Sequence, residues 1–392
     1  MHILVYKYRL YPTLSQEKAL YCILRICRYW YNMCLSERKL AWELEARNVN
    51  KGEQEKTSIL YRKAFRCADR VFSQTLQSVC DDLDKTFAAF FRRVKAGETP
   101  GYPRFKSANR FHSFEFKQFG AGARLDGKRL KLYGIGRVRA RWHRELVGKV
   151  KKVRIVERAG KWYACFTVEQ ADPLPLPATG ASVGIDVGYL GAAHHERRRE
   201  GGQSTVVSHL AESAAGRAAL PRTQGQGRQE QAQGTFRRVQ RLHEHVANTR
   251  HDFLNKQVYA LVIRYDRIAV EDLRITNMVR NPHLAKSILD SGWGYFKEKL
   301  ASKAVNAGRA VVFVNPAYTS STCSTCKRDF PDFSLSTRWV ECVCGLALDR
   351  EGFADLTVHN AALNILKRAG WVTSVSANVV APEHALLRSP RL

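Results

Sequence analysis

The interpretation of this sequence depends on two short segments, Val183-Gly184-Ile185-Asp186-Val187-Gly188 and Ile268-Ala269-Val270-Glu271-Asp272-Leu273. In each, a carboxylate lies within or at the end of an apolar run that predicts a buried strand. A buried carboxylate is costly unless it is paired or binds a metal ion. Two such carboxylates on strands can converge on Mg²⁺, and paired metal ions can bind the reacting oxygens of a phosphodiester. Taken singly, Asp186 and Glu271 are best explained as ordinary residues at a strand edge or end; with the features below, the pair predicts a nuclease site.

The sequence around these acids alternates between strand-like and helix-like patterns, which is typical of an α/β sheet. A linker rich in proline, residues 173–180, precedes this half of the chain. The predicted elements are strands at 183–187, 267–271 and 310–314 and helices at 236–263 and 293–306. Residues 191–235 are rich in Gly, Gln, Arg and Ala with little periodicity, so we expect a loop or a disordered segment there.

The N-terminal half combines helices with short strands. Residues 3–11 predict a strand that stops at Pro12, and Thr13 with Gln16 predicts a capping box at the start of a helix. Apolar side chains then recur at helical spacing at Leu20, Leu24, Cys27, Tyr31 and Leu35, and a second helix is predicted at 72–95. The predicted strands that follow are 113–116, 150–156 and 162–168. These strands predict a small β-barrel or sheet that the strand at 3–11 can join.

Four of the ten cysteines are clustered, as Cys323-Ser-Thr-Cys326 and Cys342-Val-Cys344. Paired cysteines of this kind are typical of a zinc ribbon, in which four thiolates bind one structural zinc ion. The second pair has one intervening residue where two are usual, which predicts strained geometry. The alternative is four free thiols in a surface loop. The other six cysteines lie singly in apolar patterns and are interpreted as buried thiols.

The composition is strongly basic, with 64 Lys and Arg against 36 Asp and Glu, a formal charge of +28. A folded chain with this charge favours a polyanionic partner, nucleic acid first and an acidic membrane surface second. No apolar run approaches the ~18 residues that a membrane helix needs, so a cytosolic protein is expected.

Two segments interleave basic and aromatic side chains, which can contact phosphates and stack on bases. They supply the candidate nucleic-acid-binding residues Lys7, Arg9, Tyr102, Arg104 and Lys106. A basic amphipathic edge strand explains the pattern equally well.

Together these pieces resemble the transposon-encoded TnpB (OrfB) family of RNA-guided nucleases, which is related to type V CRISPR effectors. The resemblance covers most of the chain. It is carried by residues 6–12, 27–32, 89–106, 184–188, 270–273, 315–326 and 360–366.

The resemblance implies an α+β multidomain fold. A helical bundle inserted in a small β-barrel would precede a RuvC-like (RNase H fold) α/β domain that a zinc ribbon interrupts. The expected boundaries are 1–15 for the first barrel strand, 16–97 for the helical recognition domain, 98–175 for the β-barrel (wedge) domain, 176–315 and 349–371 for the RuvC-like domain, 316–348 for the zinc ribbon and 372–392 for a disordered tail.

The resemblance also implies a function: an endonuclease that serves a transposon and cuts target double-stranded DNA selected by a guide RNA. Its cofactors would be structural Zn and catalytic Mg, and its partners guide RNA and DNA rather than a membrane. The chain would act as a monomer or dimer in the prokaryotic cytoplasm, associated with the nucleoid. An older label, DNA-strand transferase, has no support here, because no nucleophilic Tyr accompanies a His-bearing metal motif.

The sequence departs from the family at the third catalytic acid. The family's third Asp stands two residues before the Asn-Ala-Ala that opens the last helix, and Val358 occupies that place here. Asp355 is the nearest substitute and is predicted as the third acid, with Glu351 and Asp349 as alternatives. Residues 189–235 also differ from the family.

These departures and the short cysteine pair indicate a decayed or frameshifted copy. A second function therefore stays open: a catalytically degenerate RNA-guided DNA-binding protein, such as a repressor.

Overall fold

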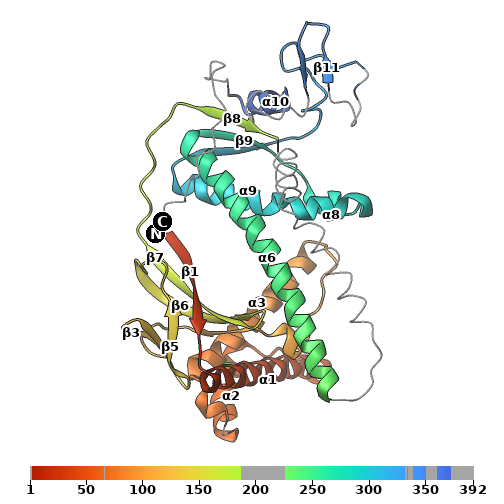
Figure 1. Cartoon of the computed structure of the whole chain (residues 1–392). Coiled ribbons are helices and arrows are strands. Elements are labelled where there is room, and N and C mark those ends of the chain that lie inside the picture. The colour runs from red at the N-terminus through yellow and green to blue at the C-terminus, as the bar shows by residue number, and fades with distance from the viewer. Residues whose placement is uncertain are drawn as a thin grey trace. The chain divides into compact units, whose positions relative to one another are not determined.

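The structure is a computed structural model that describes residues 2–65, 67–186, 226–331, 333, 339–349 and 360–371. The chain divides between Asp172 and Pro173 into two compact units, which are described separately (Figure 1). Among the described helices, none is long and apolar enough to cross a membrane.

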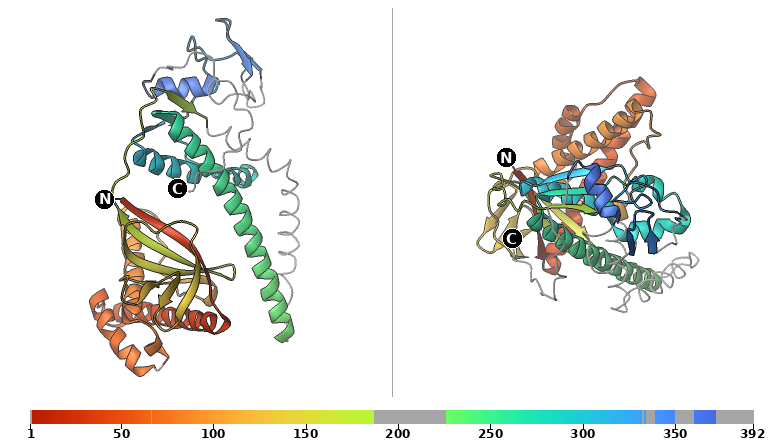
Figure 2. Two further views of the ribbon diagram at one scale, coloured as in Figure 1. Left: turned by 60° about the vertical axis from the view of Figure 1, so that its left-hand side comes forward. Right: turned by 90° about the horizontal axis from the view of Figure 1, so that it is seen from above.

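The first unit is built on a seven-stranded antiparallel sheet with the strand order β2-β6-β7-β1-β5-β4-β3. Its strands are β1 (His2–Tyr11), β2 (Ser113–Phe116), β3 (Ala123–Asp126), β4 (Arg129–Leu132), β5 (Gly136–Arg141), β6 (Lys149–Arg158) and β7 (Lys161–Gln170). The sheet curls into a nearly closed barrel, because the chain beyond β2 bridges back to β3 through Phe119 and Ala123. Figure 2 shows this curvature in profile.

Three helices cover the sheet of the first unit: α1 (Leu14–Glu45), α2 (Lys51–Ala64) and α3 (Ser73–Lys95). α1 begins with the predicted capping box, in which the Thr13 hydroxyl accepts from the Gln16 N–H and the Gln16 side chain accepts from the Thr13 N–H. Apolar residues of α1 and α3 and the inward residues of the strands form one continuous core. Trp30 and Trp162 are among its largest fully buried side chains.

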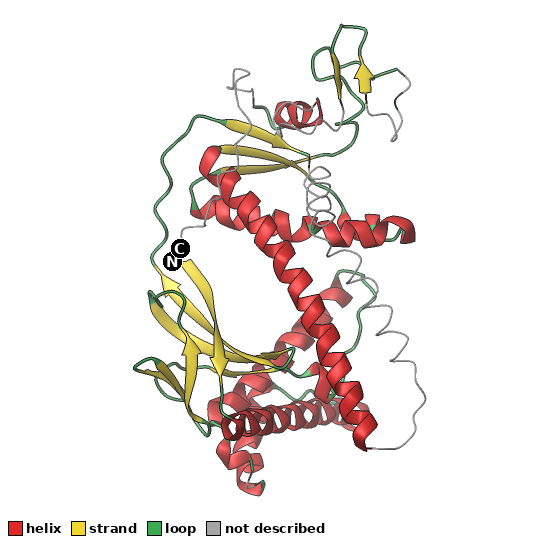
Figure 3. Cartoon of the chain, viewed as in Figure 1, coloured by secondary structure: helices red, strands yellow, loops and turns green. Residues whose placement is uncertain are grey.

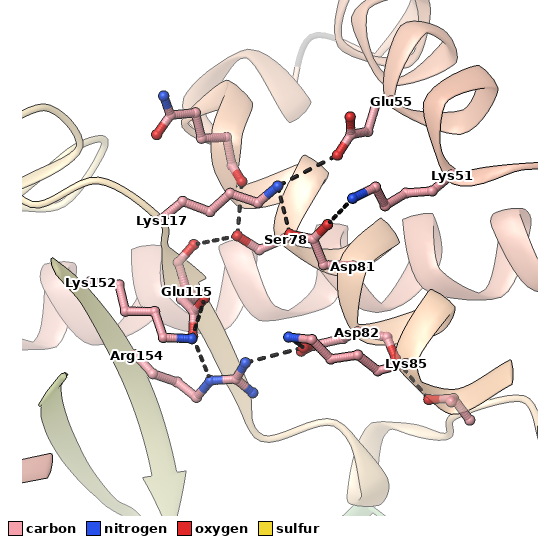
Figure 4. Close-up of polar contacts among 12 residues, drawn as sticks. Lys51, Glu55, Ser78, Asp81, Asp82, Lys85, Glu115, Lys117, Lys152 and Arg154 are labelled. Atoms are coloured by element: carbon pink, nitrogen blue, oxygen red, sulfur yellow. Dashed lines mark hydrogen bonds and ion pairs between the residues drawn. The ribbon is translucent and has the colours of Figure 1, made fainter. Parts of the chain in front are cut away.

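A network of ion pairs joins α3 to the sheet, and Figure 4 shows its acidic and basic side chains pointing toward one another. The Glu115 carboxylate of β2 is buried and lies 3.1 Å from Lys152 and 3.1 Å from Arg154, both on β6. Arg154 also pairs with Asp82 of α3 at 3.2 Å, and Asp81 pairs with Lys117 at 2.6 Å. Removal of one partner would leave a buried charge uncompensated, so this network fixes the helices on the sheet.

The second unit contains a three-stranded sheet with the order β10-β9-β8 and all strands parallel. The strands are β8 (Ser182–Ile185), β9 (Arg267–Glu271) and β10 (Ala310–Val314). The preceding stretch 173–180 forms no regular element, and the Asp266 carboxylate accepts from the N–H groups of Thr179 and Gly180. Parallel strands of this kind need helices on both faces, and both faces are covered here.

One face of this sheet packs on α6 (Gln226–Arg264) and α9 (Trp293–Asn306), and the other on α10 (Asn360–Arg368), as Figure 3 shows. Ile268 and Val270 of β9 pack with Leu254 of α6 and Phe296 of α9, whereas Ala269 faces Ile365 of α10. Two shorter helices, α7 (Ile275–Met278) and α8 (Pro282–Ser291), follow β9. A hairpin of β11 (Trp339–Glu341) and β12 (Ala347–Asp349) lies before α10.

Most predicted elements are confirmed, including the strand at 3–11, which pairs with β7 and β5. Two predictions are wrong. Of the six single cysteines expected to be buried, Cys67 is exposed and Cys22 and Cys165 are only half-buried. Residues 226–235, expected as loop, form the first turns of α6. Gln, Arg and Ala favour helix without an apolar period, so this segment gave no periodic signal. The rest of the expected loop (191–225), the tail from 372 and the acids Glu351 and Asp355 lie outside the described residues.

The approach of α10 to β8 leaves no room for a side chain at Gly184. A Cβ atom there would lie 1.9 Å from the Ala362 carbonyl oxygen. We expect Gly184→Ala to lower the free energy of unfolding by about 2–3 kcal/mol, because backbone must move to admit the methyl group. Denaturant unfolding of the full chain tests this. The matched control is Gly101→Ala, where the added atom meets no described atom within 4 Å. Equal stability of the two variants would contradict the close approach.

Candidate functional site

The two acids singled out in the sequence come together at the carboxyl ends of β8 and β9. Ile185 pairs with Val270, so the next positions in register are Asp186 and Glu271. Side chains alternate along a strand, and Gly184 and Ala269 both face α10. Asp186 and Glu271 therefore belong to the face of the sheet that α10 covers.

Glu271 is strongly perturbed by this placement. Its side chain is only 6% exposed. Burial, and next the charge of Asp186, raise the pKa of Glu271 to about 7, while the Thr319 hydroxyl and Arg368 act in the opposite direction. A carboxyl group with a pKa far above its ordinary value, next to a second carboxyl group, is typical of a functional site.

The residues of this pair fit a hard divalent cation. Mg²⁺ prefers carboxylate oxygens and retains water in its remaining positions. A cation between Asp186 and Glu271 would relieve the repulsion that raises the pKa of Glu271. The predicted third acid, Asp355, and its alternative Glu351 lie outside the described residues, and the other alternative, Asp349, is the last residue of β12.

The segment 315–326 lies against both this pair and α10. The Thr319 hydroxyl donates to Glu271 Oε1 at 2.5 Å, and Thr319 is itself buried. Two asparagines of α10 bind the backbone of the segment: Asn364 donates to the carbonyls of Thr319 and Thr322, and Asn360 bonds Thr322 and Ser324. Thr319 and the two asparagines lie in segments already singled out in the sequence, but the contact of Thr319 with Glu271 is seen only in the fold.

The four clustered cysteines also come together. Their sulfur atoms all lie within 4.8 Å of one another, with Cys323 3.7 Å from Cys344 and Cys326 3.3 Å from Cys342. Tetrahedral zinc with Zn–S bonds of ~2.3 Å places its sulfurs ~3.8 Å apart, so the four residues fit one such ion. The cluster closes over a small apolar group that includes Phe330 and Val340.

The thiols of this cluster perturb one another. Burial opposes ionisation of Cys323, but hydrogen bonds from the N–H groups of Cys326 and Thr325 and from neighbouring thiols lower its pKa to about 7. For Cys342, a backbone hydrogen bond from Cys344 favours the thiolate, yet burial and the other thiols raise the pKa to about 12 overall. Without a cation, the Cys323 thiolate forms readily and the Cys342 thiolate poorly, as expected for ligands of a metal site.

The first unit carries the candidate nucleic-acid interface. Lys7 is exposed on the outer face of β1, and its ammonium lies 4.1 Å from the centroid of the Tyr163 ring. Arg9 is half-buried beside the same ring at 5.2 Å, and its Nη1 has no hydrogen-bond acceptor among the described residues. Both predicted cations thus lie on an outward strand face with a stacked aromatic ring.

The fold extends this basic face across β5 and β4, which the sequence analysis did not identify. Register places Arg9 opposite Arg141, and Arg139 opposite both Tyr11 and Arg129. Like charges on directly opposite residues are destabilising, which favours an anionic ligand over this face. The exposed cations are Arg124, Arg129, Lys131, Arg137, Arg139 and Arg141, and Asp126 pairs with Arg137. The alternation of basic residues at 137, 139 and 141 is the signal that could have revealed them.

The second predicted segment forms a loop against α1. Asn32 clamps the backbone of Lys106, donating to its carbonyl and accepting from its N–H. The Lys106 ammonium lies 4.0 Å from the Tyr31 ring centroid, and burial lowers its pKa. Tyr102 and Arg104 are exposed and line a pocket of about 400 Å³ with Leu35, Lys39, Pro103 and Phe105. The structure thus separates an anchored Lys106 from an accessible Tyr102 and Arg104.

Comparison with known families agrees with this organisation. Three family models match in chain order: "Helix-turn-helix domain" of the OrfB type at residues 1–47, "Probable transposase" of the OrfB type at 165–282, and "Cas12f1-like, TNB domain" at 293–365. The first covers β1 and α1, and the third spans α9, the cysteine cluster and most of α10. These matches confirm the resemblance to the transposon-encoded TnpB (OrfB) family.

Two curated relatives match over most of their length. "Putative RNA-guided DNA endonuclease" of Streptomyces pristinaespiralis is 28% identical, over 98% of this chain and 94% of the relative. "Putative RNA-guided DNA endonuclease InsQ" of Escherichia coli (strain K12) is 28% identical, over 86% of each chain.

Among solved structures, similarity was found to a "Cas12f1-sgRNA-target DNA complex", with 13% identity, 93% of this chain and 99% of that chain covered, and a TM-score of 0.27. A "CRISPR-Cas12f Ternary Complex" gives 14% identity, 89% and 81% coverage, and a TM-score of 0.34. These scores are too low to support a conclusion about the fold.

The geometry of the cysteine cluster predicts one tightly bound zinc ion per chain. Elemental analysis of extensively dialysed protein is expected to find about one equivalent, and Cys323→Ser to remove it, because three thiolates and water hold zinc less tightly than four thiolates. Cys165→Ser, a cysteine on β7 in the first unit, is the matched control. A zinc content near zero in folded protein would contradict the site.

The raised pKa of Glu271 predicts how the stability of the Mg²⁺-free protein depends on pH. The folded protein holds this proton more tightly than the unfolded chain, so the stabilising contribution is complete below about pH 4.5 and is lost as the pH rises through about 7. The amide of Glu271→Gln does not titrate, so this variant does not lose stability as the pH rises through about 7. We expect its free energy of unfolding, relative to that of the wild type, to increase by about 2 kcal/mol between pH 5 and pH 8.

Urea unfolding at the two pH values measures this difference. Glu298→Gln, an exposed acid on α9, is the matched control and is expected to change little. A Glu271→Gln difference that is independent of pH would show that the carboxyl group titrates normally.

Proposed function

We propose that this protein is an RNA-guided DNA endonuclease whose cleavage centre contains Asp186 and Glu271. One observation carries the proposal: two carboxylates meet at the ends of adjacent parallel strands, and one of them is buried with a raised pKa. Two relatives that match over most of their length are named as RNA-guided DNA endonucleases, which supports the reaction class. In this proposal the second unit is a RuvC-like domain, and the cysteine hairpin is its zinc ribbon.

The residues of the centre have distinct tasks. Asp186 and Glu271 would hold Mg²⁺, which when bound supplies a Lewis acid for phosphodiester hydrolysis. Thr319 donates to one Glu271 oxygen and so leaves the second oxygen available for a ligand. Burial beneath α10 excludes water from one side of Glu271 and strengthens its electrostatic interactions. The third acid would come from the segment before α10, with Asp355 the first candidate.

The first unit would bind the nucleic acids. Its outer β1–β5–β4 face offers rows of arginines to phosphates, and Tyr102 with Arg104 offers a ring and a charge beside a pocket. Guide RNA would select the DNA by base pairing while the protein contacts backbones. The helical and barrel parts, residues 16–97 and 98–175, would form this binding half.

A second candidate is an RNA-guided DNA-binding protein that no longer cuts. The observation in its favour is Val358, which stands where the family has its third acid. Asp355 lies about one helical turn, ~5.4 Å, from that place if the helix extends to it. Catalytic ligands need placement within about half an ångström, so weak cleavage is expected even if Asp355 substitutes.

The test is plasmid cleavage by the purified protein–RNA complex with Mg²⁺. We expect slow, guide-dependent cutting that Asp186→Ala and Glu271→Ala each abolish, with guided DNA binding retained in both variants. Asp252→Asn, an exposed acid paired with Lys256 on α6, is the matched control and should cut normally. Loss of cutting in Asp355→Ala rather than Glu351→Ala would identify the third acid. Guided binding without any cutting would establish the second candidate, and absence of guided binding would contradict both.

A further inference from the structure

The hydroxyl group of Thr319 has a choice of two acceptors. It lies 2.5 Å from Glu271 Oε1 and 3.0 Å from the Pro316 carbonyl oxygen. An ionised carboxylate is the stronger acceptor, so the hydroxyl donates to Glu271 when that group is charged. Thr319 is 2% exposed, which leaves water little opportunity to replace it. Its hydroxyl therefore fixes one Glu271 oxygen.

The backbone before Thr319 is held in an unfavourable conformation. Tyr318 has φ of 62°, in the left-handed region that non-glycine residues seldom adopt, and its side chain is 74% exposed. Such a conformation costs about 1–3 kcal/mol and persists only where surrounding contacts impose it. An exposed ring makes few such contacts, so the constraint comes from the neighbours of Thr319.

The constraint is supplied by α10. Asn364 donates to the Thr319 carbonyl at 2.9 Å and to the Thr322 carbonyl at 2.6 Å. Asn360 accepts from the Ser324 N–H at 2.6 Å and donates to the Thr322 carbonyl at 2.6 Å. Both asparagines are buried. They grip the backbone from 319 to 324 along one face of the helix.

The segment 319–324 also contains Cys323, the first cysteine of the cluster. Cys323 directly precedes Ser324, whose N–H is bound by Asn360, and Lys367 of α10 donates to the Ser324 carbonyl. Cys323 lies four positions after Thr319. A rigid connection of this kind transmits a displacement at the cysteines to the hydroxyl that holds Glu271.

We infer that Thr319 is a positioning residue for Glu271, and that Asn360 and Asn364 couple it to the cysteine cluster, so that zinc binding by the cysteines orders the Glu271 carboxylate for its own cation. This inference rests on the proposed role of Asp186 and Glu271 as a cation site. The hairpin thus becomes part of the cleavage centre's geometry as well as a stabilising element.

The test uses Mn²⁺ as a probe for the acid pair, with binding to the full-length, zinc-loaded chain measured by electron paramagnetic resonance. The part of the Mn²⁺ binding that is lost in Asp186→Asn is assigned to the site formed by Asp186 and Glu271. Thr319→Val keeps the shape and removes the hydroxyl, and we expect it to weaken that binding about tenfold. Thr319→Ser restores the hydroxyl and is expected within about threefold of wild type. Thr249→Val, which removes an exposed hydroxyl on α6 that donates to the His245 carbonyl, is the matched control and is expected to bind normally.

A second arm tests the coupling. Release of zinc with an organomercurial is expected to weaken Mn²⁺ binding about tenfold in the wild type. In Asn364→Leu the binding starts weak and should change little when zinc is released. Thermal unfolding of each variant separates misfolding from loss of positioning. If Thr319 had only a structural role, Thr319→Val would be less stable than the wild type, and Thr319→Ser would not restore Mn²⁺ binding.

The outcomes are distinct. Equal Mn²⁺ affinity in Thr319→Val and wild type overturns the positioning role, and equal affinity with and without zinc overturns the coupling. Wild-type Mn²⁺ binding that Asp186→Asn leaves unchanged overturns the cation site itself, and with it the cleavage centre of the proposed function. Cleavage of DNA is not needed for any of these results.

Discussion

The structure of the second unit depends on a buried carboxylate beside another carboxylate. Glu271 ends the central strand of a three-stranded parallel sheet, and Asp186 follows the neighbouring strand. Burial and like charge both oppose ionisation, which explains the raised pKa. The surroundings are organised around this pair: Gly184 lets α10 approach, α10 grips the segment 319–324, and that segment supplies the hydroxyl that reaches Glu271.

The charges of the first unit are arranged differently inside the fold and on its outer strand face. Its internal charges are paired, as in the network of Glu115, Arg154 and Asp82 that joins α3 to the sheet. Its outer strand face is different, because rows of arginines lie opposite one another with Asp126 as the acid paired among them. Selection for stability alone would not produce such rows. They account for part of the +28 charge and fit a polyanion bound outside the barrel.

The sequence predicted elements well where their pattern is strictly periodic. The strand at 3–11, the helix at 293–306 and the strands at 267–271 and 310–314 were placed within a residue. It failed at 226–235, where a helix carries no apolar stripe. The acids Asp186 and Glu271 and the four cysteines were found from their local setting, because a carboxylate in an apolar run and paired cysteines are visible without a fold.

Other features could not be predicted, because they depend on contacts between distant segments. Thr319 reaches Glu271 across 48 positions of the chain, and Asn364 reaches Thr319 across 45. The arginine rows exist only once β4 and β5 pair in the observed register. The sequence pattern predicts the same nucleic-acid-binding role for Lys106 and Arg104. In the structure, Asn32 and Tyr31 anchor Lys106, whereas Arg104 is exposed.

The central claim is that Asp186 and Glu271 form one cation site beneath α10. A crystal structure of the protein soaked in Mn²⁺, with data collected at the manganese absorption edge, tests it most directly. The anomalous difference map is expected to contain a peak between the two carboxylates, separate from a zinc peak at the four cysteines. Two carboxylates that point apart, or a manganese peak only elsewhere, would contradict the claim.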